Sequence, residues 1–218
     1  ATPFIITMKK KAIIYIDGYN WYHGIFRHKP EWKWLNLQSF FKTLRSDEEI
    51  IAIKLFSAWI EHDPSAKERQ ERYFNALRAL PLVKIIFGLF QNREVTCRAD
   101  CGRKYKVPEE KKTDVNLAVE IMDDAIKNAC EKMFVISGDA DVQPAVEWVA
   151  KNHGHIKITV LIPALPDEQK FRRTDYYRTR GLDVDCKFLP LGNIKDHQFP
   201  NLVKIAEGKF AARPHIWR

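Results

Sequence analysis

The sequence is short of cysteine, of glycine-rich motifs and of long apolar runs, and each shortage excludes a class of protein. Four cysteines in 218 residues, in a chain without a signal-peptide pattern, are expected to be thiols or metal ligands rather than disulfides. The glycines form neither a Walker-type phosphate loop nor a Gly-x-Ser-x-Gly elbow. No apolar run reaches the ~18 residues that cross a bilayer, so we expect a cytoplasmic protein without a membrane partner.

What the sequence does contain is enough apolar material for one core, together with an excess of positive charge. Hydrophobic residues make up 45% of the chain, which suits a single domain of ordinary size. The 36 Lys and Arg against 28 Asp and Glu give a formal net charge of +8, which favours a polyanionic partner such as nucleic acid. Residues 1–7 precede Met8 and a run of lysines, and we interpret them as an expression leader outside the fold.

Short apolar runs alternate along the chain with segments of helical periodicity. This βαβα order predicts an α/β protein whose parallel strands are joined by right-handed crossovers. The helix from Thr113 is expected to pack through Val115, Ala118, Met122 and Ala125, with Asp123 and Asp124 in solvent. The expected helices are 21–27, 36–45, 64–80, 113–128 and 140–151, and the expected strands are 12–17, 50–60, 83–90, the apolar run from 133, 157–162 and 184–189.

Four aspartates occupy equivalent places in this pattern. Asp17 ends the strand 12–17, Asp139 and Asp141 follow the apolar run from 133, and Asp114 opens the helix after Thr113. Because the carboxyl ends of parallel strands meet at one edge, we expect these carboxylates to converge, although each alone is also a common helix cap. Two carboxylates about 4 Å apart repel by roughly 4 kcal/mol at an effective dielectric near 20. The cluster therefore requires protons or a divalent cation, and hard oxygen ligands favour Mg²⁺ or Mn²⁺ and phosphodiester hydrolysis.

Two segments concentrate basic side chains. Residues 91–112 are expected to form a long loop or a short hairpin, and the segment after Asp167 is either a helix with a solvated basic face or a clamp for a nucleic-acid backbone. Trp32 and Trp34 allow either packing over the first helix or base stacking. Cys97 and Cys101 supply at most half of a zinc site. The candidate backbone-binding residues are Arg98, Arg103, Lys104, Lys106, Lys111, Lys112, Arg172 and Arg173.

Three ordered motifs resemble the NYN domain, in the LabA-like (DUF88) branch of the PIN-like nuclease superfamily. They are Ile16-Asp17-Gly18-Tyr19-Asn20, Lys112-Thr113-Asp114-Val115 and Ser137-Gly138-Asp139-Ala140-Asp141. The resemblance implies a three-layer α/β/α sandwich with a mainly parallel central sheet, over residues 8–166. It also implies that Asp17, Asp114, Asp139 and Asp141 bind Mg²⁺ or Mn²⁺, that Asn20 orients a ligand or the substrate, and that Thr113 and Ser137 support the acids.

We therefore expect a metal-dependent endoribonuclease that cuts single-stranded RNA and leaves a 5′-phosphate and a 3′-hydroxyl, as the resemblance implies. Two alternatives stay open. One is an RNA-binding or regulatory NYN module that does not turn over, and the other is a toxin or phage-defence nuclease acting on RNA or single-stranded DNA. Residues 167–218 are interpreted as a basic C-terminal extension packed on the domain or continuing it, and the resemblance allows a homodimer.

Overall fold

A six-stranded parallel sheet forms the centre of the protein. The computed structural model describes residues 8–97 and 101–218, and for residues 90–93 and 105–110 it describes the backbone only. The strands lie in the order β3-β2-β1-β6-β7-β8, and every neighbouring pair is parallel, as predicted. They are β1 Lys10–Asp17, β2 Glu48–Ser57, β3 Val83–Phe87, β6 Lys132–Ile136, β7 Lys157–Ile162 and β8 Val184–Phe188.

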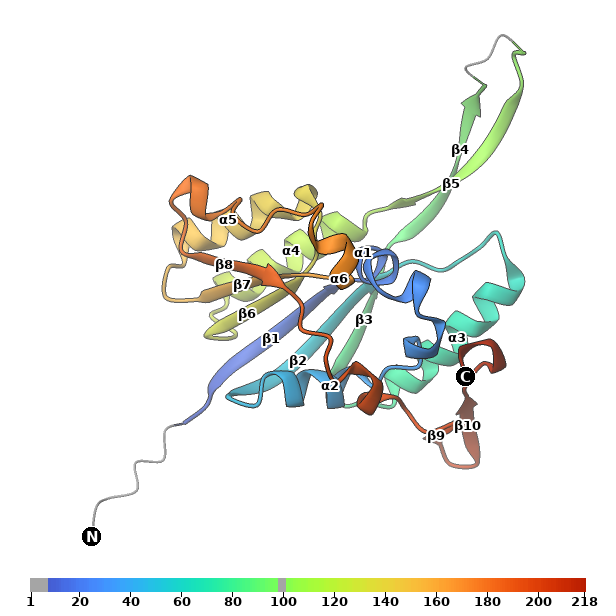
Figure 1. Ribbon diagram of the computed structural model, residues 1–218, viewed down its shortest axis with the longest axis horizontal. Helices are drawn as coiled ribbons and strands as arrows, with labels where there is room; N and C mark the ends of the chain where they lie inside the picture. The colour runs from blue at the N-terminus through green and yellow to red at the C-terminus, as the bar shows by residue number, and fades with distance from the viewer. Residues whose placement is uncertain (1–7, 98–100) are drawn as a thin grey trace.

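Helices cover both faces of the sheet, which confirms the predicted three-layer α/β/α architecture (Figure 1). Helices α1, α2 and α3 pack on one face through residues such as Trp21, Phe40 and Leu77, whereas α4 and α5 pack on the other through Leu117 and Val146. The helices are α1 Gly18–Gly24, α2 Leu37–Leu44, α3 Pro64–Arg78, α4 Thr113–Ile126, α5 Gln143–Asn152 and α6 Pro166–Gln169. Short 3₁₀ turns are η1 Phe26–His28, η2 Pro30–Trp32, η3 Ala140–Val142, η4 Arg178–Arg180, η5 Ile194–His197 and η6 His215–Trp217.

The central strand β1 is apolar on both faces because it is covered on both. Ile14 and Ile16 face the cluster under α1, α2 and α3, and Ile13 and Tyr15 face the cluster under α4 and α5. The chain leaves β1 towards β2 and β3 on one side of the sheet, and leaves β6 towards β7 and β8 on the other. The strand order therefore reverses between β1 and β6, and ligands of open α/β sheets bind outside the carboxyl ends of the strands at such a point.

A hairpin replaces the end of the expected strand 83–90. Strand β3 ends at Phe87, and β4 Leu89–Thr96 then pairs antiparallel with β5 Lys104–Lys111, so the hairpin alternative holds for residues 91–112. The hairpin extends away from the sheet (Figure 1). At its base, a Cβ on Gly88 would lie 2.2 Å from Thr113 Oγ1. The hairpin and the start of α4 approach so closely that only glycine fits between them.

The buried face of α4 differs from the predicted one. Leu117, Ile121 and Ala125 are fully buried, whereas Val115 is 65% exposed and Met122 is only partly covered. Of the predicted face, Ala125 is fully buried, Ala118 and Met122 are partly buried against the same core cluster, and Val115 faces outward. The helix carries apolar residues around much of its circumference, so helical periodicity is compatible with either face.

A buried ion network explains which face of α4 turns inward. The prediction that Asp124 lies in solvent is wrong, because its Oδ2 accepts hydrogen bonds from Tyr15 Oη at 2.6 Å and from Lys54 Nζ at 2.5 Å. Lys54 also pairs with Glu120 at 2.6 Å. Burial alone would lower the pKa of Lys54, but the hydrogen bonds to the two carboxylates outweigh it and raise this pKa. Asp123, by contrast, forms the expected exposed pair with Lys127.

The C-terminal residues pack on the face of the sheet that carries α2 and α3. Strands β9 Leu202–Ala206 and β10 Lys209–Ala212 form a second antiparallel hairpin next to α3. Trp34 is fully buried, packs on Trp217 with ring centroids 6.3 Å apart and donates its Nε1 hydrogen to Pro200 O. This tryptophan therefore packs in the core against C-terminal residues, whereas packing over the first helix was expected. None of the helices that the structure describes is long and apolar enough to span a bilayer.

The Lys54 network yields a stability prediction. In Lys54→Met, the Asp124 carboxylate stays buried without its cation, so we expect the free energy of unfolding to fall by about 3–5 kcal/mol. Urea denaturation measures this loss, and Lys54→Met combined with Asp124→Asn should recover part of it, because asparagine is neutral and its Oδ1 can still accept the Tyr15 hydroxyl. The matched control is Lys127→Met, which removes an exposed lysine and should cost much less. Equal losses in the two single variants would contradict a structural role for the network.

Candidate active site

Asp17 is the most buried carboxylate at the carboxyl end of the sheet. It is the last residue of β1 and is 1% exposed. Its Oδ1 accepts the backbone N–H of Asn20 at 3.0 Å and so caps α1. Its Oδ2 accepts hydrogen bonds from Asn20 Nδ2 at 2.7 Å and from Ser137 Oγ at 2.8 Å. The same carboxylate is therefore a helix cap through one oxygen and part of a polar cluster through the other.

Asp139 repeats this arrangement on the neighbouring strand. It follows β6, and its Oδ1 accepts the backbone N–H of Asp141 at 3.0 Å, which caps η3. Its own backbone N–H donates to Ser137 Oγ at 3.0 Å. Its Oδ2 lies 3.5 Å from Asn20 Nδ2. One side-chain amide thus stands between two carboxylates from the two strands that flank the switch point.

The electrostatics of this pair favour a cation. Burial raises the pKa of Asp17, and the nearby charge of Asp139 raises it further, while the hydrogen bonds from Asn20 and Ser137 partly lower it. The ionised carboxylate is therefore held in a place that disfavours its charge. A positive charge beside Asp17 and Asp139 would offset both effects.

Asp114 and Asp141 line a groove of about 540 Å³ beside this pair. Asp114 lies in the first turn of α4, as predicted, but Thr113 is the first helical residue rather than the cap. Lys111 and Lys112 form part of the groove wall, and Lys112 has a φ of 72°, in the left-handed region that costs a lysine about 1–2 kcal/mol. Such backbone conformations cluster at functional sites.

Asp17 and Asp139 thus share the Asn20 amide, whereas Asp114 and Asp141 line one groove. Within residues 8–97 and 101–218, no group of three or more His, Cys, Asp or Glu stands close enough to hold a metal ion. The donor chemistry still fits Mg²⁺ or Mn²⁺, because these hard cations take oxygen ligands and Mg²⁺ is usually held by only one or two carboxylates, with water and phosphate oxygens around it.

The predicted basic residues are spread over several surfaces. Lys111 and Lys112 lie at the groove, while Arg103 and Lys104 are exposed on the protruding hairpin. Arg98 lies outside the described residues, and for Lys106 the backbone alone is described. Arg172 and Arg173 are exposed in the segment between α6 and η4. A basic helix was one of the alternatives predicted for this segment, and the structure has these two short elements there instead. Arg173 pairs with Asp175 at 3.0 Å.

The two cysteines of the expected half zinc site lie near the tip of the hairpin. Cys97 and Cys101 are free thiols that interact through their side chains. The backbone hydrogen bond with Arg103 and the contact with Cys97 lower the pKa of Cys101. No third zinc ligand accompanies them in the described part of the chain.

An apolar strip of α4 lines the groove, and it was not predicted from the sequence as part of a surface. Its members, Val115, Ala118, Val119 and Met122, line the groove together with the acids and lysines, and Val119 is 58% exposed. The sequence signal for this strip is that α4 carries more apolar residues than one packing face needs. Exposed apolar residues next to charged ones are typical of a binding surface.

Comparisons with known proteins place these features in context. The family model of the NYN domain matches residues 11–178. The 6-hydroxy-3-succinoylpyridine 3-monooxygenase HspA of Pseudomonas putida is 29% identical, over 69% of this chain and 58% of that relative, so the chain spans less than two thirds of the relative's length. The crystal structure of a protein of unknown function from Vibrio parahaemolyticus aligns with a TM-score of 0.47 and 18% identity, over 73% of this chain and 83% of that chain.

The raised pKa of Asp17 predicts a pH-dependent loss of stability. As pH rises above about 4, the unfolded chain releases the Asp17 proton first, so the free energy of unfolding falls until the folded-state pKa is passed. Asp17→Asn has no such titration. We expect the free energy of unfolding of the wild type, relative to Asp17→Asn, to decrease as pH rises from 4, as measured by urea denaturation in EDTA.

A second variant tests the cause of this shift. Ser137→Ala removes a hydrogen bond that lowers the pKa of Asp17, so the same decrease should extend to higher pH. A difference between wild type and Asp17→Asn that is constant with pH, or grows as pH rises, would contradict the assignment.

Proposed function

The chain belongs to the NYN domain family, and we propose that it is a metal-dependent endoribonuclease. The observation that carries the proposal is the pair of carboxylates, Asp17 and Asp139, that share the Asn20 amide at the switch point of a parallel sheet. NYN domains are generally nucleases, and this pair fits the hard cations that such enzymes use. We assign the metal-binding role to Asp17 and Asp139, with Asp114 and Asp141 as further acids of the site.

Each residue of the site has a separate task in this proposal. Asn20 holds the two carboxylates in place, and Ser137 links them by donating to Asp17 and accepting from the backbone of Asp139. Asp141 is exposed and borders the groove, where it can accept a proton from an entering water molecule. A bound Mg²⁺ or Mn²⁺ supplies Lewis-acid stabilisation of the phosphate and lowers the pKa of water.

The groove along α4 supports single-stranded RNA as the substrate. Its apolar strip, Val115 to Met122, offers surface to an unpaired base, which a duplex keeps stacked inside. Lys111 and Lys112 stand on the same groove and can contact phosphates. Arg103 and Lys104 are exposed on the hairpin and extend this positive charge, although Lys104 also pairs with Glu94 at 3.0 Å.

Cleavage of labelled single-stranded RNA tests the proposal. We expect wild type to cut in Mn²⁺ or Mg²⁺ and not in EDTA, and Asp17→Asn and Asp139→Asn each to lose at least about a hundredfold in rate, since one interaction of the transition state is worth several kcal/mol. The matched control is Asp47→Asn, the same change at an exposed residue next to the start of β2, at the opposite edge of the sheet. Its rate should equal that of wild type.

The rival within the family is an RNA-binding module without turnover. If wild type binds the same RNA but cuts neither it nor matched single-stranded DNA under any of these metals, the binding module replaces the enzyme. Cutting of DNA as well as RNA would instead favour the toxin or phage-defence alternative. The LabA-like branch, the cytoplasmic location and a homodimer stay predictions.

The basic hairpin gives a second measurable expectation. Arg103→Ala combined with Lys104→Ala should reduce the slope of log binding constant against log salt by about 0.7 for each phosphate that the variant no longer neutralises. The matched control is Lys204→Ala combined with Lys209→Ala, two exposed lysines of the β9–β10 hairpin. The same slope in wild type and in the Arg103 and Lys104 variant would remove the hairpin from the RNA-binding surface.

The printed name of the Pseudomonas relative offers an activity from another class. A monooxygenase consumes O₂ and a reductant, so an assay of NADH-dependent oxygen uptake with a hydroxypyridine distinguishes it from a nuclease. We favour the nuclease because the switch point carries paired carboxylates, and because 29% identity over 58% of that relative leaves much of it without a counterpart.

A further inference from the structure

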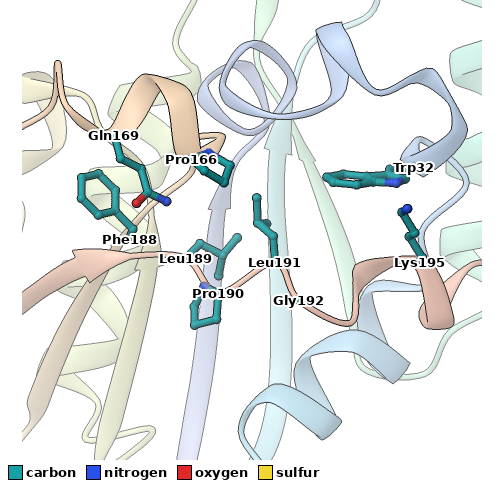
Figure 2. Close-up of a pocket in the computed structure, with 9 residues that line it drawn as sticks. All are labelled: Trp32, Pro166, Gln169, Phe188, Leu189, Pro190, Leu191, Gly192 and Lys195. Carbon is teal, nitrogen blue, oxygen red and sulfur yellow. The ribbon is translucent and has the colours of Figure 1, made fainter.

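A second crevice lies on the face of the sheet that carries α2 and α3. It has a volume of about 440 Å³ and is bounded by η2, the loop around α6 and the residues that follow β8. Figure 2 shows Trp32 and Lys195 on one side and Gln169 and Phe188 on the other, with Leu189 and Leu191 between them. This is the size range of pockets that bind small ligands.

The walls combine a flat aromatic ring with a few polar groups. Trp32 is partly exposed, and Lys29 Nζ lies 5.6 Å from the centroid of its ring. Among the described residues, the Gln169 side chain has one long hydrogen bond, 3.5 Å from its Nε2 to Ala164 O, so its amide can turn to a ligand. Lys195 is exposed, and none of the described residues that line the crevice is acidic. The charge and the ring together suit a flat heteroaromatic group that carries a negative charge.

The crevice is connected to the candidate active site through α1. This helix begins at the Asp17 cap and ends at Gly24, where a Cβ would lie 2.0 Å from Pro163 O. Pro163 starts the loop that leads to Pro166 and Gln169 of the crevice wall. Seven helical residues span roughly 10 Å. The crevice therefore lies towards the end of α1 that is far from Asp17, and a strand bound at both places would follow α1 between them.

We propose that this crevice is a binding site for one unpaired nucleobase of the RNA strand, with the base stacked on Trp32. Gln169 contacts the polar edge of the base, and Lys195 contacts a phosphate. The site rests on the proposed function for its ligand, yet it is separate from the acids and its occupation does not require cleavage.

Binding of a fluorescein-labelled 12-nucleotide single-stranded RNA in EDTA, followed by anisotropy, tests the proposal without catalysis. We expect Trp32→Leu to weaken binding about tenfold, because base–aromatic stacking is worth a factor of this order, and Trp32→Phe to restore most of the affinity. Lys195→Glu should weaken binding severalfold more than Lys209→Glu, the same charge change on the β9–β10 hairpin.

Two further arms identify the occupant. In a series of RNAs that each carry one abasic nucleotide at a different position, one RNA should bind wild type more weakly than the intact RNA does. Trp32→Leu should bind this RNA and the intact RNA equally well. Nicotinate, a free heteroaromatic acid, is the small-molecule probe. Competition by nicotinate that depends on Trp32, together with no effect of any abasic position, would overturn the nucleobase assignment in favour of a small ligand.

The outcomes separate this site from the nuclease proposal. The base site alone is refuted if wild type cuts RNA in Mn²⁺, but Trp32→Leu binds RNA like wild type and Lys195→Glu binds it like Lys209→Glu. Binding that depends on Trp32 in a protein that never cuts would refute the nuclease alone. If Trp32→Leu loses its circular dichroism spectrum, the folded variants Lys195→Glu and Gln169→Ala decide: unchanged affinity in both would refute the base site.

Discussion

The buried carboxylate of Asp17 is the constraint on which the arrangement of the site depends. Its two oxygens cap α1, hold the Asn20 amide and accept the Ser137 hydroxyl, so they join β1 to the loop after β6. Parallel strands that diverge on either side of this point leave room for a ligand between their carboxyl ends. The cost is a charge held where burial opposes it. A buried carboxylate that is hydrogen-bonded but stabilises the fold less than an apolar side chain would is typical of a functional site.

The placement of α4 depends on a second buried charge. Lys54 on β2 and Tyr15 on β1 hold Asp124 near the end of the helix, while Asn116 donates to Phe87 O at its start. A helix fixed at both ends presents Asp114 and the apolar strip in one defined orientation. The network therefore helps to determine which apolar face of α4 is left for the groove.

The surfaces around the acids differ in chemistry, and this difference bears on how a strand would cross them. On the α4 side, the groove joins carboxylates, lysines and aliphatic side chains. On the other face of the sheet, the crevice offers an indole ring and an amide with a lysine at its mouth. An aromatic ring of this kind can stack on any base, because every base has a π-face. Under the proposed function, both surfaces would suit the unpaired bases of a single strand better than a duplex.

The amino-acid sequence by itself determined the α/β class, the parallel sheet and the aspartates at its carboxyl edge, because buried strands followed at once by an acid are a local pattern. It did not determine which of Asp123 and Asp124 is buried, since both suit an exposed helix until Lys54, far away in the sequence, supplies a partner. The crevice at Trp32 was equally hidden, because its walls come from η2, the α6 loop and the residues after β8. Such features arise from contacts between distant segments, which only the tertiary structure decides.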